Sequence, residues 1–140
     1  MVEFALTGPI LLFLFLGVVE LGHGLNSYLT ILASARDAAR MGSQTGIADT
    51  TAVNQLKTLV TNETSRLSSA PIDTTTNCPV GEGMCITSNC PVGTGTCSSS
   101  ITNKWLEVTV CYDHPLIVGI PWLTGNELNI CSQTKMRIAQ

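Results

Sequence analysis

The chain is poor in charge and in aromatic residues, and its first basic side chain is Arg36. Charged residues make up 12% of the sequence and aromatic residues 5%, and the formal net charge is -3. Because phosphate backbones are bound by clusters of Lys and Arg, this composition does not indicate a nucleic-acid-binding protein. A cleavable secretory signal needs a basic start and a small-residue cleavage site, and neither is present. We therefore expect a retained hydrophobic helix, and the missing basic start suggests that a leader has already been removed.

The six cysteines lack the spacings that mark redox and metal motifs. There is no Cys-x-x-Cys and no Cys-x-x-Cys-His, so a thioredoxin-like site or a haem attachment is not supported. The spacing is too wide for ordinary zinc knuckles, and neither His23 nor His114 lies among the cysteines. We interpret His23 as an interface or surface side chain and place His114, beside Asp113, in a turn. No nucleophile stands at a recognisable spacing from a base, so we predict no catalytic residue, no metal, no cofactor and no enzymatic activity.

The chain does contain an uncharged, almost wholly apolar run between Glu3 and Glu20. Large apolar side chains would occupy every face of the helix it forms, which is unusual for an exposed helix of a soluble domain. At ~1.5 Å per residue the run is about 24 Å long, slightly short of a bilayer core of ~30 Å. Continuing the run through Leu21 makes it long enough to span. The run is therefore a candidate membrane anchor with an acid at each end.

Beyond Glu20 the same helix is predicted to continue in amphipathic form. Apolar residues recur there at helical spacing, and the Ala-rich segment 33–40 strongly favours a helix. Gly42, followed by Gly46, offers a stop signal. We predict one long helix over residues 2–43. We expect its soft points at Gly8-Pro9 and Gly22-His23-Gly24.

A second, shorter helix is predicted after Asp49, whose side chain is suited to cap it. Its pattern places apolar side chains on one stripe and charged side chains towards solvent. The predicted buried residues are Val53, Leu56, Val60 and Leu67, and the predicted solvated residues are Lys57, Glu63 and Arg66. We expect the helix to end near Ser68, before Pro71. Asn62-Glu63-Thr64 also matches an N-glycosylation acceptor, a tripeptide that often arises by chance.

Residues 72–103 are rich in turn-forming residues and contain an internal repeat. The pattern Asn-Cys-Pro-Val-Gly-x-Gly-x-Cys occurs at 77–85 and again at 89–97, and its Pro and Gly favour tight loops over strands. An even number of cysteines beyond a membrane anchor indicates disulfides and an oxidising compartment. The repeat suggests the pairs Cys78–Cys85 and Cys90–Cys97, while Cys111 and Cys131 could join paired strands. Exchange of partners between the two loops stays open.

Two runs near the C-terminus, residues 105–112 and 128–138, alternate in polarity and are rich in β-forming residues. A long connection broken by Pro115, Pro121 and Gly125 is expected between them. We predict that the runs pair antiparallel, with apolar faces against the C-terminal half of the first helix. The predicted fold class is α+β: a long N-terminal hydrophobic helix, a short second helix and a small antiparallel sheet with disulfide-braced loops. The expected division is an anchor over 1–43 and an extracellular Cys-rich region over 44–140.

The acids of the apolar segment allow two interpretations each. An acid at a membrane centre costs ~2.5–3.5 kcal/mol unless it is paired. Glu3 either pairs with the α-amino group of a neighbouring subunit's helix, or it is an ordinary acid that favours the helix N-terminus. Glu20 either marks the headgroup boundary or pairs with a basic residue across subunits. Arg36, Asp37 and Arg40 form a solvated face or, alternatively, ion pairs between subunits.

The N-terminal residues resemble the start of TadE-like pilins, from the tight-adherence branch of type IV pili. That family begins with Val-Glu-Phe-Ala-Leu, an x-Pro, a leucine-rich run and Gly-x-x-Glu-hydrophobic-Gly, and residues 2–22 follow this order. Residues 33–42 are similar to the family's Ala-Ala-Arg-x-Ala-Ala-Arg segment, and residues 108–138 to its strand–loop–strand ending. The Cys repeat lies outside the resemblance. Glu3 lies closer to the N-terminus than the family's acid usually does.

The resemblance implies a prepilin with a type IV pilin-like fold, cleaved by a prepilin peptidase just before the apolar helix. It implies a precursor in the inner membrane, which the pilus assembly machinery draws into an extracellular homopolymeric filament. Glu3, Phe4 and Glu20 are then the expected subunit-pairing residues. The alternatives are a minor pilin, or a signal-anchored membrane protein whose Cys-rich ectodomain binds a ligand or partner.

Overall fold

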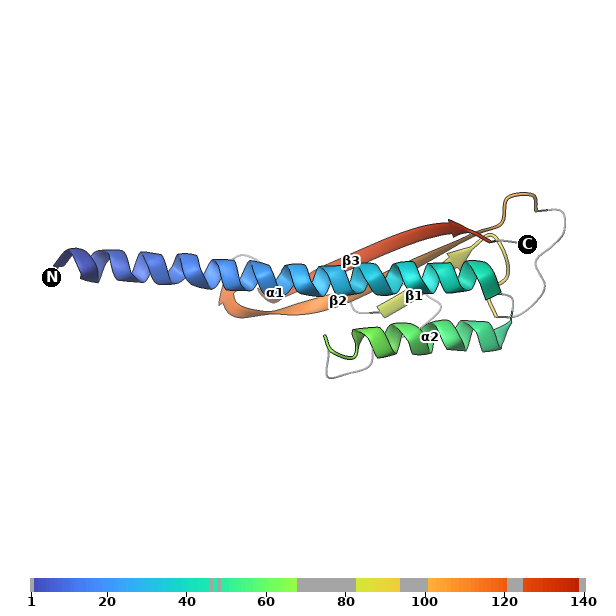
Figure 1. The fold of residues 1–140 in the computed structure, drawn as a ribbon, viewed down its shortest axis with the longest axis horizontal. Helices are drawn as coiled ribbons and strands as arrows, with labels where there is room; N and C mark the ends of the chain where they lie inside the picture. The colour runs from blue at the N-terminus through green and yellow to red at the C-terminus, as the bar shows by residue number, and fades with distance from the viewer. Residues whose placement is uncertain are drawn as a thin grey trace.

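The computed structural model describes residues 2–45, 47, 49–67, 83–93, 101–120 and 125–138, and their side chains except those of residues 2, 3, 5, 117–120, 125 and 126. The elements follow in the order α1 (Val2–Thr45), α2 (Thr50–Thr64), β1 (Gly83–Ser88), β2 (Trp105–Ile120) and β3 (Gly125–Arg137). The strands form one antiparallel sheet in the order β1-β2-β3. Figure 1 shows that the N-terminal part of α1 extends well beyond both the sheet and α2. The predicted α+β fold class is confirmed.

Helix α1 is one uninterrupted helix of 44 residues, which corresponds to about 66 Å at ~1.5 Å per residue. It continues through Pro9, Gly22 and Gly24, so none of the predicted soft points ends it. A proline removes one backbone hydrogen bond and need not end a helix, because the leucine-rich neighbours favour helix on both sides. The predicted long helix over residues 2–43 is confirmed, and its last residue, Thr45, lies two positions beyond the predicted end.

Helix α2 lies beside the C-terminal half of α1 and runs in the opposite direction (Figure 1). Its predicted cap is confirmed: Oδ1 of Asp49 accepts a hydrogen bond from the backbone nitrogen of Thr51 at 3.1 Å. The buried residues of the helix are Ala52, Val53, Leu56, Val60 and Thr64. Leu67 lies beyond the helix end and is partly buried against the core. The apolar stripe is therefore what holds α2 to the rest of the molecule.

The sheet is centred on β2, which pairs with β1 on one edge and with β3 on the other. Cys111 and Cys131 lie opposite each other in β2 and β3 and form a disulfide. The side chain of Asn89 closes the β1–β2 end, because it accepts a hydrogen bond from the backbone of Trp105 at 2.8 Å. The same side chain donates to the carbonyl of Asn103 at 2.7 Å.

One segment predicted to be a tight loop is a strand. Residues 83–88, which include the end of the first repeat unit, form β1. Three successive side chains in it, Met84, Cys85 and Ile86, are buried. The Gly and Pro of the repeat favour a loop, but the edge of β2 offers this short apolar segment backbone hydrogen-bond partners along one side. The tertiary partner therefore decides its conformation.

The predicted break after Tyr112 is also wrong. Strand β2 continues through Pro115 to Ile120, and β3 begins at Gly125, while Pro121 lies outside the described residues. Strand β1 pairs with β2 only as far as Cys111, so beyond that pair β3 is the single neighbour of β2 among the described residues. A proline is tolerated in such an edge position because its missing N–H can face the unpaired side. The β2–β3 register becomes irregular between Pro115 and Ile120.

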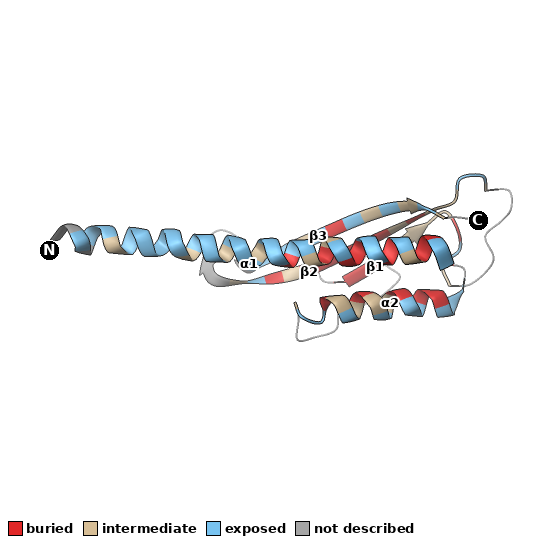
Figure 2. Cartoon of the chain, in the orientation of Figure 1, coloured by how far each residue is buried: buried red, intermediate tan, exposed pale blue. Residues whose placement is uncertain are grey.

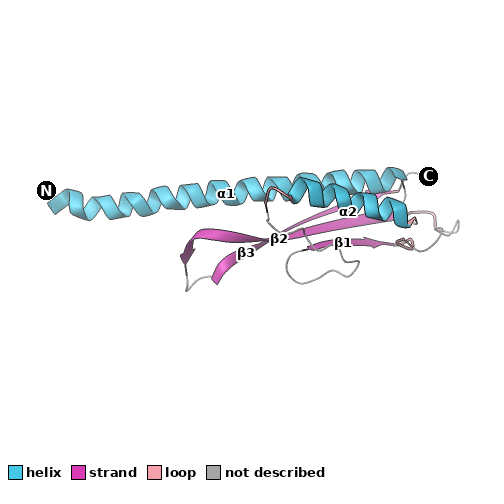
Figure 3. Cartoon of the chain, turned by 90° about the horizontal axis from the view of Figure 1, so that it is seen from below, coloured by secondary structure: helices cyan, strands magenta, loops and turns pink. Residues whose placement is uncertain are grey.

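The two helices cover one side of the sheet, which Figure 3 shows edge-on. The core lies between the helices and the sheet, and its members come from α1, α2, β1, the inner face of β2 and the connecting segments. They include Ile31, Ala35, Ala38 and Ala39 of α1, Leu56 and Val60 of α2, Met84 and Ile86 of β1, and Leu106, Val108, Val110 and Tyr112 of β2. This confirms that the sheet packs against the C-terminal half of α1. The alanines keep that helix close to the strands.

Candidate assembly surface and the polar cluster at its base

Most exposed large apolar side chains belong to α1, and the majority of these lie in its N-terminal half. Those of α1 are Phe4, Leu6, Ile10, Leu11, Leu12, Phe13, Leu14, Phe15, Val18, Val19, Leu21, Leu25, Tyr28 and Leu29. Figure 2 shows this half as an exposed helix that projects away from the body. A soluble monomer rarely leaves so large an apolar surface in water, and such surfaces mark contacts with membranes or proteins. We refer to these residues as the bare apolar surface of α1.

A polar cluster of His23, Ser27 and His114 lies where α1 enters the body. Nδ1 of His23 is 3.4 Å from Nε2 of His114, and Oγ of Ser27 is 3.3 Å from Nδ1 of His114. The Ser27 hydroxyl is also within 3.2 Å of the backbone carbonyl of His23. His114 is 1% exposed and Ser27 2% exposed. The cluster therefore joins the β2–β3 hairpin to α1 through buried polar contacts.

The placement of His114 corrects the prediction of a turn. Strand alternation puts Leu106, Val108, Val110, Tyr112 and His114 on the same inner face of β2. Burial lowers the pKa of His114, the nearby His23 lowers this pKa further, and Glu20 acts in the opposite direction. The buried ring is therefore favoured in its neutral form, in which each imidazole offers one donor and one acceptor. His23 is exposed, as predicted. The sequence does not predict its contact with His114, which lies 91 positions further along the chain.

The segment of α1 on the N-terminal side of this cluster has the length of a bilayer core. Residues 2–22 span about 31 Å at ~1.5 Å per residue, against a hydrocarbon thickness of ~30 Å. By length and composition, α1 is able to cross a membrane. The polar cluster thus lies about where such a helix would leave the hydrocarbon. Glu20, which is half-buried, lies one turn before it.

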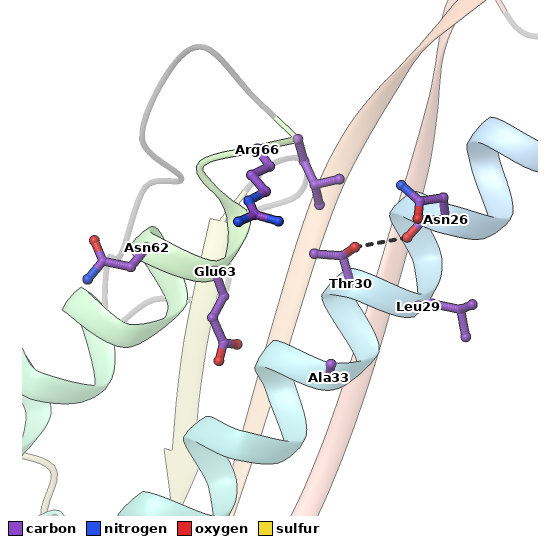
Figure 4. A pocket seen from close by; sticks show the side chains of 8 residues that line it. Asn26, Leu29, Thr30, Ala33, Asn62, Glu63 and Arg66 are labelled. Carbon is purple, nitrogen blue, oxygen red and sulfur yellow. Dashed lines mark hydrogen bonds between the residues drawn. The ribbon is translucent and has the colours of Figure 1, made fainter.

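An open groove of about 690 Å³ lies between α1 and the C-terminal end of α2. Its walls include Asn26 and Thr30 of α1, Glu63 of α2 and Arg66 just after α2, and Figure 4 shows the Glu63 carboxylate turned towards α1. Oε2 of Glu63 is buried and accepts no hydrogen bond from the described residues. Burial raises the pKa of Glu63, and the charge of Asp37 raises it further.

Glu63 therefore differs from its prediction as a solvated residue. It follows Val60 by three positions and so lies on the flank of the buried stripe, facing α1. The possible glycosylation acceptor Asn62-Glu63-Thr64 lies in the same helical segment. Its Asn62 is exposed, but Thr64 is 1% exposed and donates a hydrogen bond to the carbonyl of Val60 at 2.7 Å.

The predicted assembly residues lie along the first part of α1. Phe4 is 83% exposed, Glu20 is half-buried, and the side chain of Glu3 lies outside the described residues. Arg36, Asp37 and Arg40 are exposed, as expected for a solvated face. The structure does not bring Phe4 and Glu20 together, because they are sixteen positions apart on one helix, or about 24 Å.

The remaining predicted residues are the cysteines of the repeat. Cys85 and Cys90 are both disulfide-bonded. Cys78 and Cys97 lie outside the described residues, so the pairings Cys78–Cys85 and Cys90–Cys97 remain predictions. Within the described parts of the chain, no three His, Cys, Asp or Glu side chains gather as metal ligands would.

Comparison with known proteins bears on the N-terminal segment. Residues 1–40 match the model of a family described as TadE-like protein, which confirms the resemblance of this segment. The match includes the bare apolar surface and continues through Ala39 into the part of α1 that packs on the sheet. No curated protein and no solved structure matches the chain.

Proposed function

From its TadE-like first 40 residues, we propose that this chain is a pilin-like component of a tight-adherence pilus, and specifically a structural subunit that polymerises through α1. In this proposal residues 1–43 anchor the precursor in the inner membrane and then form the filament core. Residues 44–140 form the Cys-rich region on the outside of the filament. A prepilin peptidase and the pilus assembly machinery act on the precursor.

The observation that carries the proposal is the bare apolar surface of α1, whose side chains the described part of the chain leaves 41–83% exposed. Burying one large apolar side chain contributes ~1.5–3 kcal/mol relative to water. A helix with fourteen such side chains is therefore stable only in lipid or against other apolar helices. Lipid and neighbouring subunits are competing apolar environments, so the transfer from one to the other needs work from an assembly motor.

Three residues are proposed to direct subunit pairing in the filament. Glu3 neutralises the α-amino group of a neighbouring chain, which sets the axial register of the two helices. Phe4 packs against the neighbouring helix beside this pair, and Glu20 forms an ion pair across subunits. An acid buried among apolar helices is costly unless it is paired, so Glu3 favours only the register in which its partner is in reach.

Sheared extracellular material from the native cell provides the direct test. Negative-stain imaging shows whether filaments are present, and N-terminal sequencing with mass spectrometry shows whether this chain is their main component. A chain abundant in the filaments supports the proposal. A chain found only in trace amounts is a minor pilin, and a chain that stays with the inner membrane is an anchored module with a Cys-rich ectodomain.

Substitution of Glu3 tests the pairing role. We expect Glu3→Ala and Glu3→Lys to fold and enter the membrane but to give few or no filaments, because the partner amine is left unpaired. Glu3→Asp keeps the charge and is the matched control, for which we expect filaments. Filament yield is measured by quantifying the chain in sheared and membrane fractions. Normal filaments from Glu3→Ala would refute the pairing role.

A further inference from the structure

On the face of the β2–β3 hairpin that points away from the helices, basic residues lie at one end and acidic residues at the other. We call this face the outer face, and strand alternation together with the pairing register defines its members. They are Trp105, Glu107, Thr109, Cys111, Asp113 and Pro115 of β2, and Glu127, Asn129, Cys131, Gln133, Lys135 and Arg137 of β3. Figure 3 shows this hairpin with both helices on its other side.

One end of the outer face is basic. Lys104, Lys135 and Arg137 line a single hollow of about 350 Å³ together with Trp105. The ammonium of Lys135 lies 3.9 Å from the ring centre of Trp105 and 3.9 Å from Oε2 of Glu107, and its side chain is 55% exposed. Among the described residues of the outer face at this end, the two cations Lys135 and Arg137 outnumber the one acid, Glu107, so their summed charge is positive. It lies at the end of the molecule that is farthest from the bare helix (Figure 1).

The other end of the outer face is acidic. Asp113 and Glu127 lie there, and Glu127 is exposed. Asn129 donates a hydrogen bond to Oδ1 of Asp113 at 2.5 Å. Because the amide of Asn129 is neutral, this hydrogen bond does not cancel the negative charge of Asp113. Strand β2 contains no Lys or Arg, and β3 contains none before Lys135. Eight positions separate Glu127 from Lys135 along β3, which is about 26 Å at ~3.3 Å per residue.

We propose that the acidic end of the outer face binds the basic end of a second copy of this chain, displaced along the filament axis. The inference rests on the proposed polymerisation, in which all copies point the same way. Parallel copies place the helix-proximal end of one hairpin against the distal end of the next, and these ends have opposite charge. The ion pairs formed are Glu127 and Asp113 of one copy with Lys135 and Arg137 of its neighbour. The contact sets axial spacing on the outside, as the apolar helices do in the core.

A zero-length carbodiimide, which joins amines only to carboxylates already in contact, tests the contact in sheared wild-type filaments. We expect a product that links Lys135 to Glu127 or Asp113. Within one molecule such a link is excluded, because the groups lie about 20–26 Å apart along the strands. The link between Lys135 and Glu107, which are in contact within each molecule, is the internal control. Filaments that give the control link but no long-range link would overturn the inference.

The same reaction on detergent-dispersed subunits separates a filament contact from other pairings. We expect only the Lys135–Glu107 link there, because a few exposed ion pairs hold dispersed subunits together weakly. Equal long-range linking in dispersed subunits would show an antiparallel dimer instead of an axial contact, and would overturn the inference. If wild-type filaments lack the chain altogether, the proposed function fails, which is a different result from missing links in filaments that contain it.

Charge exchange supplies a second measurement. We expect Arg137→Glu and Glu127→Arg each to reduce filament yield severalfold, and the double variant to restore most of it. Lys57→Glu, which makes the same charge change on α2 away from the outer face, is the matched control and should assemble. Thermal unfolding of dispersed subunits checks that each variant folds. A double variant no better than the single ones would contradict pairing between these two residues.

Discussion

At the scale of single residues, Gly42 determines how closely α1 approaches the sheet and α2. A Cβ at this position would overlap Cδ2 of Leu106 and would lie 3.2 Å from Cδ1 of Leu56. Both leucines are fully buried, so neither is able to turn aside into solvent. Overpacking of this kind costs ~1–3 kcal/mol, which exceeds the gain of up to ~1 kcal/mol that Ala brings to a helix. We expect Gly42→Ala to lower the melting temperature of the detergent-solubilised protein, measured by circular dichroism.

Glycines elsewhere on the same helix are matched controls for this prediction. A Cβ at Gly22 or Gly24 would meet no other atom within 4 Å. Gly22→Ala and Gly24→Ala should therefore leave the melting temperature unchanged or raise it, because only the helix propensity changes. If Gly42→Ala raised the melting temperature as much as these controls, the close approach would not limit the packing.

His114 makes the attachment of the hairpin dependent on pH. Its pKa is lowered by burial and by His23, and raised in part by Glu20; Ser27 and the ring of Tyr112 also face it. The unfolded chain therefore binds a proton that the folded chain does not, and the free energy of unfolding falls as the pH drops below about 6.5. Above that pH the contribution is fully present. Urea unfolding at a series of pH values between neutral and mildly acidic measures this loss.

A variant without the titrating ring isolates this effect. His114→Gln keeps a polar side chain that is able to bond Ser27 but does not gain a proton in this range. We expect it to be less stable than the wild type at neutral pH, with a smaller loss of stability on acidification. A wild-type profile as flat as that of His114→Gln would contradict the assignment. His23→Gln removes the other ring of the pair and should reduce the loss only in part.

At the scale of elements, the Cys111–Cys131 disulfide fixes the register of β2 and β3. The bond closes a loop with a sequence separation of 20 residues, for which the chain-entropy estimate is about 3 kcal/mol. We expect the double variant Cys111→Ala/Cys131→Ala to lose up to this amount of unfolding free energy. Hydrogen exchange should rise first in the β2–β3 hairpin, beyond the rung where β1 ends. Faster exchange in α2 than in the hairpin would contradict this order.

The elements differ in how far the sequence alone predicts them. Both helices are predictable because their signals are local: the apolar run and Ala-rich segment for α1, and the Asp49 cap with its apolar stripe for α2. Strand β1 is not, because its partner is the edge of β2, which lies about twenty residues further along the chain. The same limit explains His23 and His114, since no local pattern indicates a contact between residues 91 positions apart. Pro115 is the opposite case. It is a local signal for the end of a strand, but the pairing of β2 with β3 continues through it.

At the scale of the whole molecule, the body and the bare helix are separable. Among the described residues, the buried core residues lie between Ile31 and Tyr112, whereas the fourteen exposed large apolar side chains of α1 lie at or before Leu29. The N-terminal half of α1 therefore contributes to assembly or membrane insertion and little to the stability of the body. A chain that begins at His23 keeps the polar cluster, the core and the described disulfide.

We expect this shortened chain, residues 23–140, to be a soluble monomer in water without detergent. Most of the bare apolar surface is removed, and the charges of the outer face contribute too little to hold two copies together at moderate salt. Light scattering coupled to size exclusion gives the mass, and circular dichroism gives the melting transition. The full-length chain in the same buffer is the control and should aggregate or form filaments. A shortened chain that remained aggregated would show that the body itself carries the self-association, since the loss of apolar helix would not have removed it.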